Sequence, residues 1–393
     1  MSTILIVDDE VQILKTMRRL FSETDYKILT AENGMDALTL LEDNPIDLII
    51  SDMKMPLMNG YQLLSTVKAK YPHIIRVSLS GYADEVAMHK RVLHNIADFS
   101  IFKPWNNDKL LQSIDKIFQT HSIIYSGKLT ETVKSHELLK PFPKNIQRMF
   151  QLLDNEDEDK LYTEIEQDPY LSEKLMNVTD AAIYGAMPGS VKQAAIYIGM
   201  YNLKCFLYWA TATLPSNEKG EDEELRNLLE KHSLSTNKIL LFLYEAFLHK
   251  QPLEASLFTG LLHNIGLLAL VQDSKNQYIK DFDSTDEILN QLLFNEQERY
   301  GATHQEIGAY LLSHYDMPFP VVESALYHHT PLNPAVVNSE LTICVHIADF
   351  YAWKYIMGKN YICLNENIFD HINVSRKDFE KRLERYMNKV LLA

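Results

Sequence analysis

One stretch, residues 46–60 (IDLIISDMKMPLMNG), constrains the fold of this chain more than any other. Residues 46–50 form the kind of apolar run that fills a buried parallel strand. Met-Pro at 55–56 and Asn-Gly at 59–60 predict a loop, so the strand ends close to Asp52. Open α/β sheets carry their chemistry at the carboxyl ends of their strands. An acid there is by itself more simply a turn or cap residue, so other stretches must decide.

Three further apolar stretches end in polar side chains of complementary kinds. Residues 3–10 (TILIVDDE) end in Asp8 and Asp9, residues 74–84 (IIRVSLSGYAD) carry Ser80, and residues 98–105 (DFSIFKPW) carry Lys103. If all are strands of one parallel sheet, these groups meet at one edge. Clustered carboxylates favour a hard divalent cation such as Mg2+. One carboxylate can then attack a phosphoryl group, whose oxygens the lysine and the hydroxyl can hold.

With this pattern, residues 1–122 resemble the receiver domain of bacterial two-component response regulators. The matching motifs are Asp8-Asp9, Asp52 with Met55-Pro56 and Gly60, Ser80-Gly81 and Lys103-Pro104. The resemblance implies that Asp52 is the phosphoacceptor. It also implies that Asp9 and Asp52 bind Mg2+, with Asp8 helping through water and the backbone carbonyl of Lys54 as a further ligand. Ser80 and Lys103 would bind the phosphoryl group.

The chain departs from the receiver pattern at Ser100. Receivers often carry Tyr or Phe three residues before the lysine, as a rotamer switch, and Ser100 occupies that position. Phe102 shares a strand face with Ser100 by alternation. The resemblance therefore predicts phosphorylation but leaves the usual coupling of hydroxyl and aromatic side chain without its aromatic partner.

The order of predicted elements indicates a multidomain chain, since 393 residues should hold two or three domains. The first 120 residues alternate strand and helix five times, which predicts a doubly wound, flavodoxin-like α/β domain with a five-stranded parallel sheet. From about residue 136 the strand signal disappears, and helical periodicity predicts an all-α, HD-related domain. We expect a receiver domain at 1–122, a linker at 123–135, a helical output domain at 136–335, and C-terminal helices packed on it at 336–393.

Helical segments are expected at specific places in both halves. In the first half they lie near residues 11–22, 35–43, 60–70, 84–95 and 107–121. In the second half they lie near residues 170–182, 191–198, 203–213, 225–250, 253–271, 339–357 and 376–392.

Composition limits the partners and the compartment. The 53 acids and 38 bases give a net charge of −15, which disfavours nonspecific binding to nucleic acid or to an anionic membrane. No apolar run approaches the ~18 residues that a bilayer crossing needs. The chain begins directly with a strand, and its three cysteines lack ligand-like spacing. We therefore expect a cytoplasmic protein with no signal peptide, no membrane contact and no nucleic-acid partner.

The helical half contains a second set of chemically notable residues: His232, His263-Asn264, His304, His328-His329 and Asp349. Taken singly, each histidine is more simply a hydrogen-bonded structural residue. Together, their order resembles that of HD-superfamily phosphohydrolases. In that family a first His, a His-Asp pair, further histidines and a late Asp bind one or more metals, and the metal activates water for attack on a phosphoester.

Asn264 breaks the metal-binding pattern, because it replaces the carboxylate of the His-Asp pair. An amide is a much poorer ligand for a hard cation and bridges two metals less effectively. Leu267 also stands where active cyclic-dinucleotide phosphodiesterases often carry a lysine, and no Gly-Tyr-Pro follows His328-His329. We therefore expect no metal in this degenerate HD site and assign no catalytic residue. Single-metal binding by His232, His263 and Asp349 stays open.

Flanking motifs resemble the HDOD domain, an all-helical, HD-related output module, over roughly residues 135–335. They are Pro141-Phe142-Pro143, Asp168-Pro169-Tyr170-Leu171, Ala182-Ile183-Tyr184-Gly185, Ala195-Ile196-Tyr197-Ile198-Gly199, residues 261–266 and 304–308, and Pro318. Two positions depart from the family: Thr179-Asp180 replaces a common Asn-Ser, and Lys140 replaces a usual Leu. HDOD modules are generally regarded as signalling modules without established catalysis.

These observations predict a response regulator of a two-component phosphorelay. A sensor histidine kinase would phosphorylate Asp52, and the receiver would control a non-catalytic HDOD module that contacts itself, as a homodimer, or a downstream protein. The alternative is a metal-dependent HD-type phosphohydrolase or cyclic-dinucleotide phosphodiesterase regulated by the receiver. A DNA-binding regulator is disfavoured, because the chain lacks a basic recognition helix and is acidic.

Overall fold

The computed structural model describes residues 2–81, 96–179, 188–214, 223–252, 256–273, 288–358, 361–365 and 367–391. The chain divides into two compact units, Met1–Ile117 and Phe118–Ala393. The helix expected at 84–95, the motif at 182–185, and parts of the helices expected at 170–182 and 253–271 lie outside the described residues.

The first unit is built on a five-stranded sheet with strand order β2-β1-β3-β4-β5, in which every neighbouring pair is parallel. The strands are β1 (Thr3–Val7), β2 (Lys27–Ala31), β3 (Leu48–Asp52), β4 (Ile75–Gly81) and β5 (Phe99–Lys103). The helices are α1 (Val11–Leu20), α2 (Gly34–Asp43), α3 (Gly60–Lys70) and α5 (Asn107–Ile124), with a 3-10 turn η1 (Phe21–Glu23). The predicted doubly wound sheet is confirmed.

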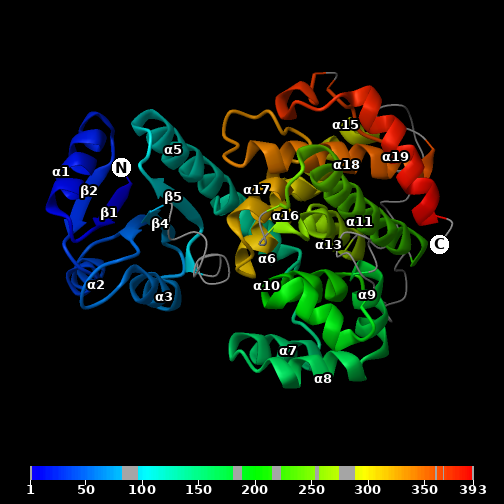
Figure 1. Ribbon diagram of the computed structural model, residues 1–393, viewed down its shortest axis with the longest axis horizontal. Coiled ribbons are helices and arrows are strands. Elements are labelled where there is room, and N and C mark those ends of the chain that lie inside the picture. Colours follow the sequence, from blue (N-terminus) through cyan, green and yellow to red (C-terminus); the bar gives the residue numbers. More distant parts are fainter. Residues whose placement is uncertain are drawn as a thin grey trace. The chain divides into compact units, whose positions relative to one another are not determined.

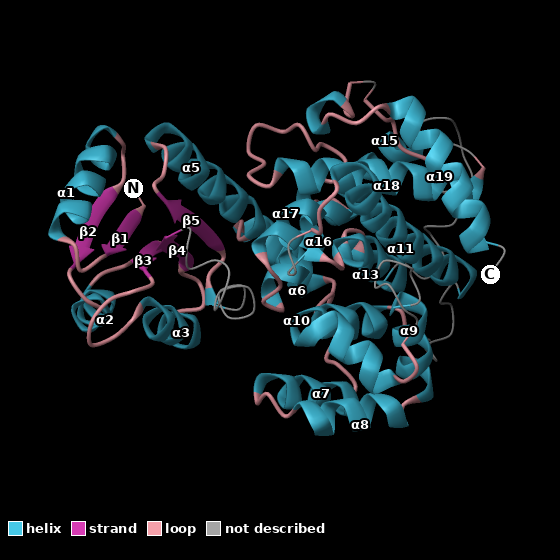
Figure 2. Ribbon diagram, in the orientation of Figure 1, coloured by secondary structure: helices cyan, strands magenta, loops and turns pink. Residues whose placement is uncertain are grey.

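Helices cover both faces of this sheet. Figure 2 shows α1 and α5 on one face and α2 and α3 on the other. All five residues of β1 and of β3 are buried, as expected for central strands covered on both sides. The strand order reverses between β1 and β3, so their carboxyl ends flank the switch point where doubly wound sheets place their ligands.

The second unit contains no strand among its described residues, which agrees with the predicted all-α domain. Its described helices, all but α12 labelled in Figure 1, are α6 (Gly127–Ser135), α7 (Lys144–Asp154), α8 (Glu158–Gln167), α9 (Pro169–Thr179), α10 (Val191–Ala212), α11 (Glu223–Leu243), α12 (Thr259–Leu262), α13 (Ile265–Asp273), α15 (Ile288–Tyr300), α16 (His304–His314), α17 (Phe319–Tyr327), α18 (Ser339–Met357) and α19 (Arg376–Leu391). A π-helical turn η4 (Tyr244–Leu248) and a 3-10 turn η6 (Asp370–Ile372) complete them. The two segments expected at 191–198 and 203–213 form one helix, α10, which is kinked at Gly199 with φ of 74°.

The stretch expected to be a linker is helical in the structure. Helix α6 occupies most of residues 123–135, and the hydroxyl of Ser126 accepts a hydrogen bond from the Leu129 N–H at its start. Leu129 and Val133 are buried in the core of the second unit, and Thr132 Oγ1 donates to the carbonyl of Tyr300 over 2.9 Å. A nine-residue helix is marginal by itself in water, so this packing, which local sequence does not encode, stabilises α6.

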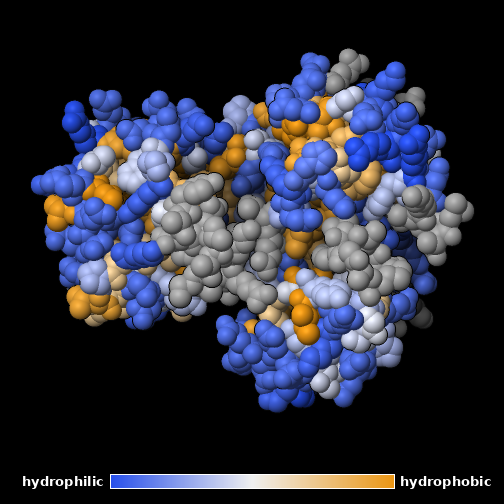
Figure 3. Space-filling view, in the orientation of Figure 1, coloured by the Kyte–Doolittle hydropathy of each residue, from blue (hydrophilic) through white to orange (hydrophobic). Residues whose placement is uncertain are grey.

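A continuous apolar core runs through the helices of the second unit, with Trp209, Trp353 and Phe206 among its fully buried side chains. Hydrophilic residues cover most of the visible surface of α7 and α8, as Figure 3 shows. None of the described helices combines the length and apolarity that a bilayer crossing needs.

Candidate functional site

Asp52 is the last residue of β3, and the loop after it is shaped around its backbone. A Cβ atom at Gly60 would lie 2.2 Å from the carbonyl oxygen of Asp52, so only glycine lets α3 start against the strand end. Asn59 caps α3 in a capping box with Gln62. The loop and cap residues at 55–60 therefore fix the position of Asp52, which is 7% exposed.

Lys103 joins the ends of three strands. Its Nζ atom lies 2.9 Å from Asp8 Oδ2 and 2.5 Å from Asp52 Oδ1. Asp8 follows β1 and is completely buried, and its other oxygen accepts a hydrogen bond from the Glu10 N–H. The convergence predicted from the sequence is thus observed for these three side chains.

The other predicted receiver residues take different positions. Ser80 lies near the end of β4, and its buried hydroxyl has no hydrogen-bond partner among the described residues. The Lys54 N–H donates to Asp52 Oδ2 over 2.6 Å, in the exposed loop that follows β3. Asp9 is exposed to solvent beside Asp8. Within the described ranges the Ser80 hydroxyl is therefore unpaired near the carboxyl end of β4, and Asp9 can reach a cation from the solvent side.

The charges at this edge are strongly coupled. Burial raises the pKa of the Asp52 carboxyl, and the ammonium of Lys103 opposes that rise. Burial would lower the pKa of Lys103, but its hydrogen bonds to Asp52 and Asp8 outweigh burial and raise that pKa. The lysine therefore stays charged beside the two carboxylates. The carboxylates of Asp8, Asp9 and Asp52 are oxygen donors of the kind that Mg2+ prefers, so the residues present fit this ion.

The departure at Ser100 has a structural counterpart on the next strand. Ser78 and Ser100 are register partners on β4 and β5, and their hydroxyl oxygens lie 2.8 Å apart. Ser78 is completely buried, so this hydrogen bond satisfies a polar group inside the sheet. Phe102, on the same strand, is 38% exposed. Ser100 thus holds two strands together where receivers often place an aromatic switch.

The second set of predicted residues meets inside the helical unit. His232 is carried by α11, His263 and Asn264 by the turn between α12 and α13, His304 by the start of α16 and Asp349 by α18, while His328 and His329 are the two residues that directly follow α17. Six of these residues are at most 3% exposed to solvent. For the seventh, His329, the side chain is 3% exposed. The structure therefore brings the five histidines and Asp349 of the predicted degenerate HD site into one buried cluster, with Asn264 next to His263 in the chain.

Close helix packing sets the positions of His263 and His304. A Cβ atom at Gly266 would lie 2.0 Å from the carbonyl oxygen of His304 and 2.5 Å from the Gly308 nitrogen. Only glycine at this position lets α13 lie directly on α16. Gly266, three residues after His263, and Gly308, four residues after His304, therefore serve packing, which brings the segments that carry the two histidines together.

Asp349 lies at the centre of one group of possible ligands. Its Oδ1 lies 2.9 Å from His232 Nε2 and 3.4 Å from His263 Nε2, while Oδ2 lies 3.7 Å from His329 Nδ1. Burial acts to raise the pKa of Asp349, but its contacts with His232 and His263 outweigh burial and hold that pKa well below its usual value. Burial lowers the pKa of His232, whose ring also stacks on Trp353.

Glu296 is a functional candidate that the sequence analysis did not single out. It is 1% exposed, and its oxygens accept hydrogen bonds from the backbone N–H of His304 at 2.7 Å and from Nδ1 of the same residue at 2.9 Å. A signal was available: Glu296 lies four residues after Leu292 and four before Tyr300, both buried on α15. A carboxylate on the buried face of a helix needs a hydrogen-bond or ion-pair partner, because burying an unpaired charge costs free energy.

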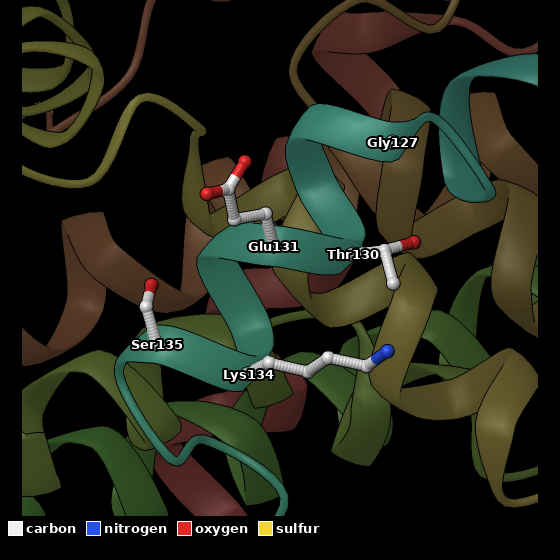
Figure 4. A pocket seen from close by; sticks show the side chains of 5 residues that line it. All are labelled: Gly127, Thr130, Glu131, Lys134 and Ser135. Carbon is white, nitrogen blue, oxygen red and sulfur yellow. The ribbon is translucent and has the colours of Figure 1, made fainter.

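Two groups of ligand-type atoms converge to within 4.8 Å of one another in the described part of the chain: His232-His263-Asp349 and His304-His328-His329. A groove in the second unit lies elsewhere, along α6. It is lined by Gly127, Thr130, Glu131, Lys134 and Ser135. Figure 4 shows Thr130 and Lys134 leaving the helix on one side and Glu131 and Ser135 on the other, so these groups do not converge on one point.

Two family models match the chain. The model of the response regulator receiver domain matches residues 4–115, and the model of the HDOD domain matches residues 139–331. The chain contains a receiver domain followed by an HDOD domain. This is the architecture of a response regulator, and both resemblances drawn from the sequence are confirmed.

Individual relatives resemble only part of this response regulator. The hydrogenase transcriptional regulatory protein HoxA of Cupriavidus necator is 30% identical over 122 residues, which are 31% of this chain and 25% of HoxA. The transcriptional regulatory protein GlrR of Escherichia coli is 30% identical over 115 residues, which are 28% of this chain and 25% of GlrR. The chain thus covers about a quarter of the length of these curated relatives.

A solved structure shows similarity of the same extent. The response regulator protein TrrA of Thermotoga maritima, in complex with Mg(2+)-BeF, is 30% identical over 30% of this chain and 98% of that one, with a TM-score of 0.28.

Proposed function

We propose that this response regulator accepts a phosphoryl group on Asp52 from a sensor histidine kinase. The observation that supports this most directly is the Asp8–Lys103–Asp52 contact at the carboxyl edge of the sheet. A buried strand end that holds two carboxylates, one ammonium and a hydroxyl, that of Ser80, with no hydrogen-bond partner among the described residues supplies a nucleophile and groups that can hold phosphoryl oxygens.

The residues divide the work of transfer. An oxygen of Asp52 attacks the phosphorus atom and forms a bond to it. The bond between phosphorus and the donor nitrogen of the kinase breaks, and the electron pair of that bond stays on the nitrogen. Lys103 can turn from the carboxylates to the new phosphoryl oxygens, and the Ser80 hydroxyl can donate to them. Asp9, Asp52, the Lys54 carbonyl and, through water, Asp8 would hold Mg2+. The ion supplies charge neutralisation when bound.

We propose that the HDOD domain is the output and acts by protein contact rather than by catalysis. The missing carboxylate at Asn264 supports this, as does the net charge of −15, which disfavours nucleic acid as the partner. A downstream protein or a second copy of the chain would be the target. Because Asp349 on α18 contacts His232 on α11, the segment 336–393 completes the output module rather than forming a separate one.

The test of phosphorylation is intact mass after incubation with a small phosphodonor and Mg2+. The wild-type chain should gain one phosphoryl group, and Asp52→Asn should gain none. Asp25→Asn, an exposed acid in the same unit, is the matched control and should be labelled like the wild type. Equal labelling of Asp52→Asn would remove Asp52 from its assigned role.

A metal-dependent phosphohydrolase is the second candidate, favoured by the buried cluster around Asp349. Purified protein should fail to turn over a cyclic dinucleotide repeatedly, because Asn264 cannot act as a bridging ligand. Multiple turnover that disappears in His263→Ala would establish the enzyme instead. The Asn264→Asp variant restores the missing carboxylate of the pair, so it tests whether the amide is the reason for the absence of turnover.

A further inference from the structure

Helix α5 carries one buried stripe along most of its length. Leu110, Ile114 and Ile117 belong to the first unit, Thr120 and Ile124 belong to the second, and all five are at most 3% exposed. They follow one another at spacings of three or four residues, so they lie on one face of the helix. Because α5 is continuous, a rotation or shift of its first turns also moves Thr120.

The end of α5 is hydrogen-bonded to two helices of the second unit. Thr120 Oγ1 lies 3.4 Å from the hydroxyl oxygen of Tyr327, the last residue of α17, and both residues are buried. Directly after α5, the hydroxyl oxygen of Tyr125 lies 2.7 Å from Ser313 Oγ on α16. Leaving a buried hydroxyl without a partner costs free energy, so the Thr120–Tyr327 pair resists separation.

Tyr327 is the middle residue of a segment that three helices hold. The Leu326 carbonyl accepts a hydrogen bond from Gln305 Nε2 on α16 over 3.1 Å, and the His328 carbonyl accepts one from His346 Nδ1 on α18 over 2.7 Å. We call Leu326, Tyr327 and His328 the hub. Each of its residues is bonded to a different helix, so a displacement of Tyr327 by α5 also acts on the contacts with α16 and α18.

The hub continues into a surface turn. The Tyr327 carbonyl accepts a hydrogen bond from the Thr330 N–H over 2.8 Å, and the Thr330 carbonyl accepts one from the Asn333 N–H over 3.0 Å. Thr330 and residues 332–334 are exposed, with Leu332 39% exposed. A shift of Tyr327 therefore reaches the protein surface, where another protein can detect it.

We propose that Thr120 and Tyr327 form a relay through which α5 displaces the hub and the surface turn at 330–334 when the receiver changes state. The relay rests on the proposed function for its input, the phosphorylation of Asp52. The contacts that carry it all lie within the second unit. The movement is a small shift of packed helices, which is a common way for a local change to spread through a domain.

Hydrogen exchange of the full-length chain, with and without Mg2+ and beryllofluoride, tests the relay. In the wild type this phosphoryl mimic should change exchange rates at least about twofold both at residues 52–60 and at 321–334. Thr120→Val and Tyr327→Phe each remove one hydroxyl of the pair at nearly constant volume. In both variants the response at 52–60 should remain, whereas the response at 321–334 should fall at least about threefold.

Two control variants leave the pair intact. Ser122→Ala removes an exposed hydroxyl of α5 that donates to the Gln119 carbonyl of the same helix. Tyr197→Phe removes an exposed tyrosine hydroxyl on α10. Both should respond to the mimic like the wild type. Each response is taken against the same variant without the mimic, because a mere loss of stability would raise both rates and leave the response in place.

A reciprocal measurement needs no phosphorylation, because coupling between two sites acts in both directions. Gln305→Met removes the hydrogen bond to the Leu326 carbonyl, and residues 118–126 should then exchange at least about twofold faster. In a Tyr327→Phe background the same change should leave exchange at 118–126 unaltered, since the hub no longer has its hydrogen bond to Thr120.

Three results would overturn the relay. The first is a response at 321–334 that survives undiminished in both Thr120→Val and Tyr327→Phe. The second is a wild type that responds at 52–60 but not at 321–334, and the third is unchanged exchange at 118–126 in Gln305→Met. A wild type without any response at 52–60 would instead refute the proposed phosphorylation, and the reciprocal measurement would still decide the relay.

Discussion

The Nζ atom of Lys103 lies 2.5 Å from Asp52 Oδ1, and the same nitrogen contacts Asp8 at 2.9 Å. One ammonium therefore neutralises part of the charge of two carboxylates from different strands. Any divalent cation that binds at this edge lies near that ammonium, so Lys103 repels the cation and weakens its binding. In the proposed phosphorylated state the same lysine would bind the phosphoryl oxygens.

Replacing this lysine should tighten Mg2+ binding. In Lys103→Met the repulsion between the ammonium and Mg2+ is gone, and we expect Mg2+ affinity to rise at least about fivefold, or about 1 kcal/mol. Isothermal titration of the full chain with Mg2+ measures the change. Lys109→Met, an exposed lysine at the start of α5, serves as control and should leave the affinity nearly unchanged. A weaker affinity in Lys103→Met would show that the lysine organises the carboxylates instead.

The hydrogen bond between Ser78 and Ser100 should show itself in a double-mutant cycle. Ser100→Ala leaves the buried Ser78 hydroxyl without this partner and should lower the free energy of unfolding of the receiver by about 1–2 kcal/mol. Removing both hydroxyls together should cost clearly less than the sum of the two single changes. Calorimetry, following the receiver transition, measures all four proteins. Additive costs would mean that the two hydroxyls do not interact.

Because α13 packs directly on α16, adding one methyl group at Gly266 should strongly lower the free energy of unfolding. Gly266→Ala would place a Cβ atom 2.0 Å from the His304 carbonyl oxygen, and separating the helices should cost roughly 2–3 kcal/mol. Gly127→Ala is the matched control, because nothing lies within 4 Å of an added Cβ there. That variant should be neutral or slightly more stable, by up to about 1 kcal/mol. Thermal unfolding compares the two, and equal midpoints would contradict the packing argument.

Phosphorylation should be passed on through α5. This helix begins four residues after Lys103 and is continuous from Asn107 to Ile124, and the division into two units falls within it. Since Ser100 replaces the aromatic switch, we expect α5 and the residues up to 135 to carry more of the signal than in a typical receiver. Hydrogen exchange with and without a beryllofluoride phosphoryl mimic measures this, with Asp52→Asn as control. Changes confined to the loops at the strand ends would refute this route.

The sequence by itself determined the receiver fold and the place of its chemistry. Parallel strands align their carboxyl ends, so Asp8, Asp52, Ser80 and Lys103 could be assigned to one edge from the apolar run that precedes each of them. The histidines of the helical half could likewise be identified by their order along the chain.

Only the tertiary structure decided which atoms of those histidines face one another. Glu296 lies eight residues before His304, and the hydrogen bond between them follows from the packing of α15 against the start of α16. The bond between Ser78 and Ser100 depends on the register of β4 and β5, and α6 depends on its contact with Tyr300. Local patterns encode which face of an element is buried, whereas the partner on that face is set by how the elements pack in three dimensions, whether it lies 8 residues away, as Glu296 does from His304, or 168, as Tyr300 does from Thr132. The close packing of the elements brings specific atoms into contact.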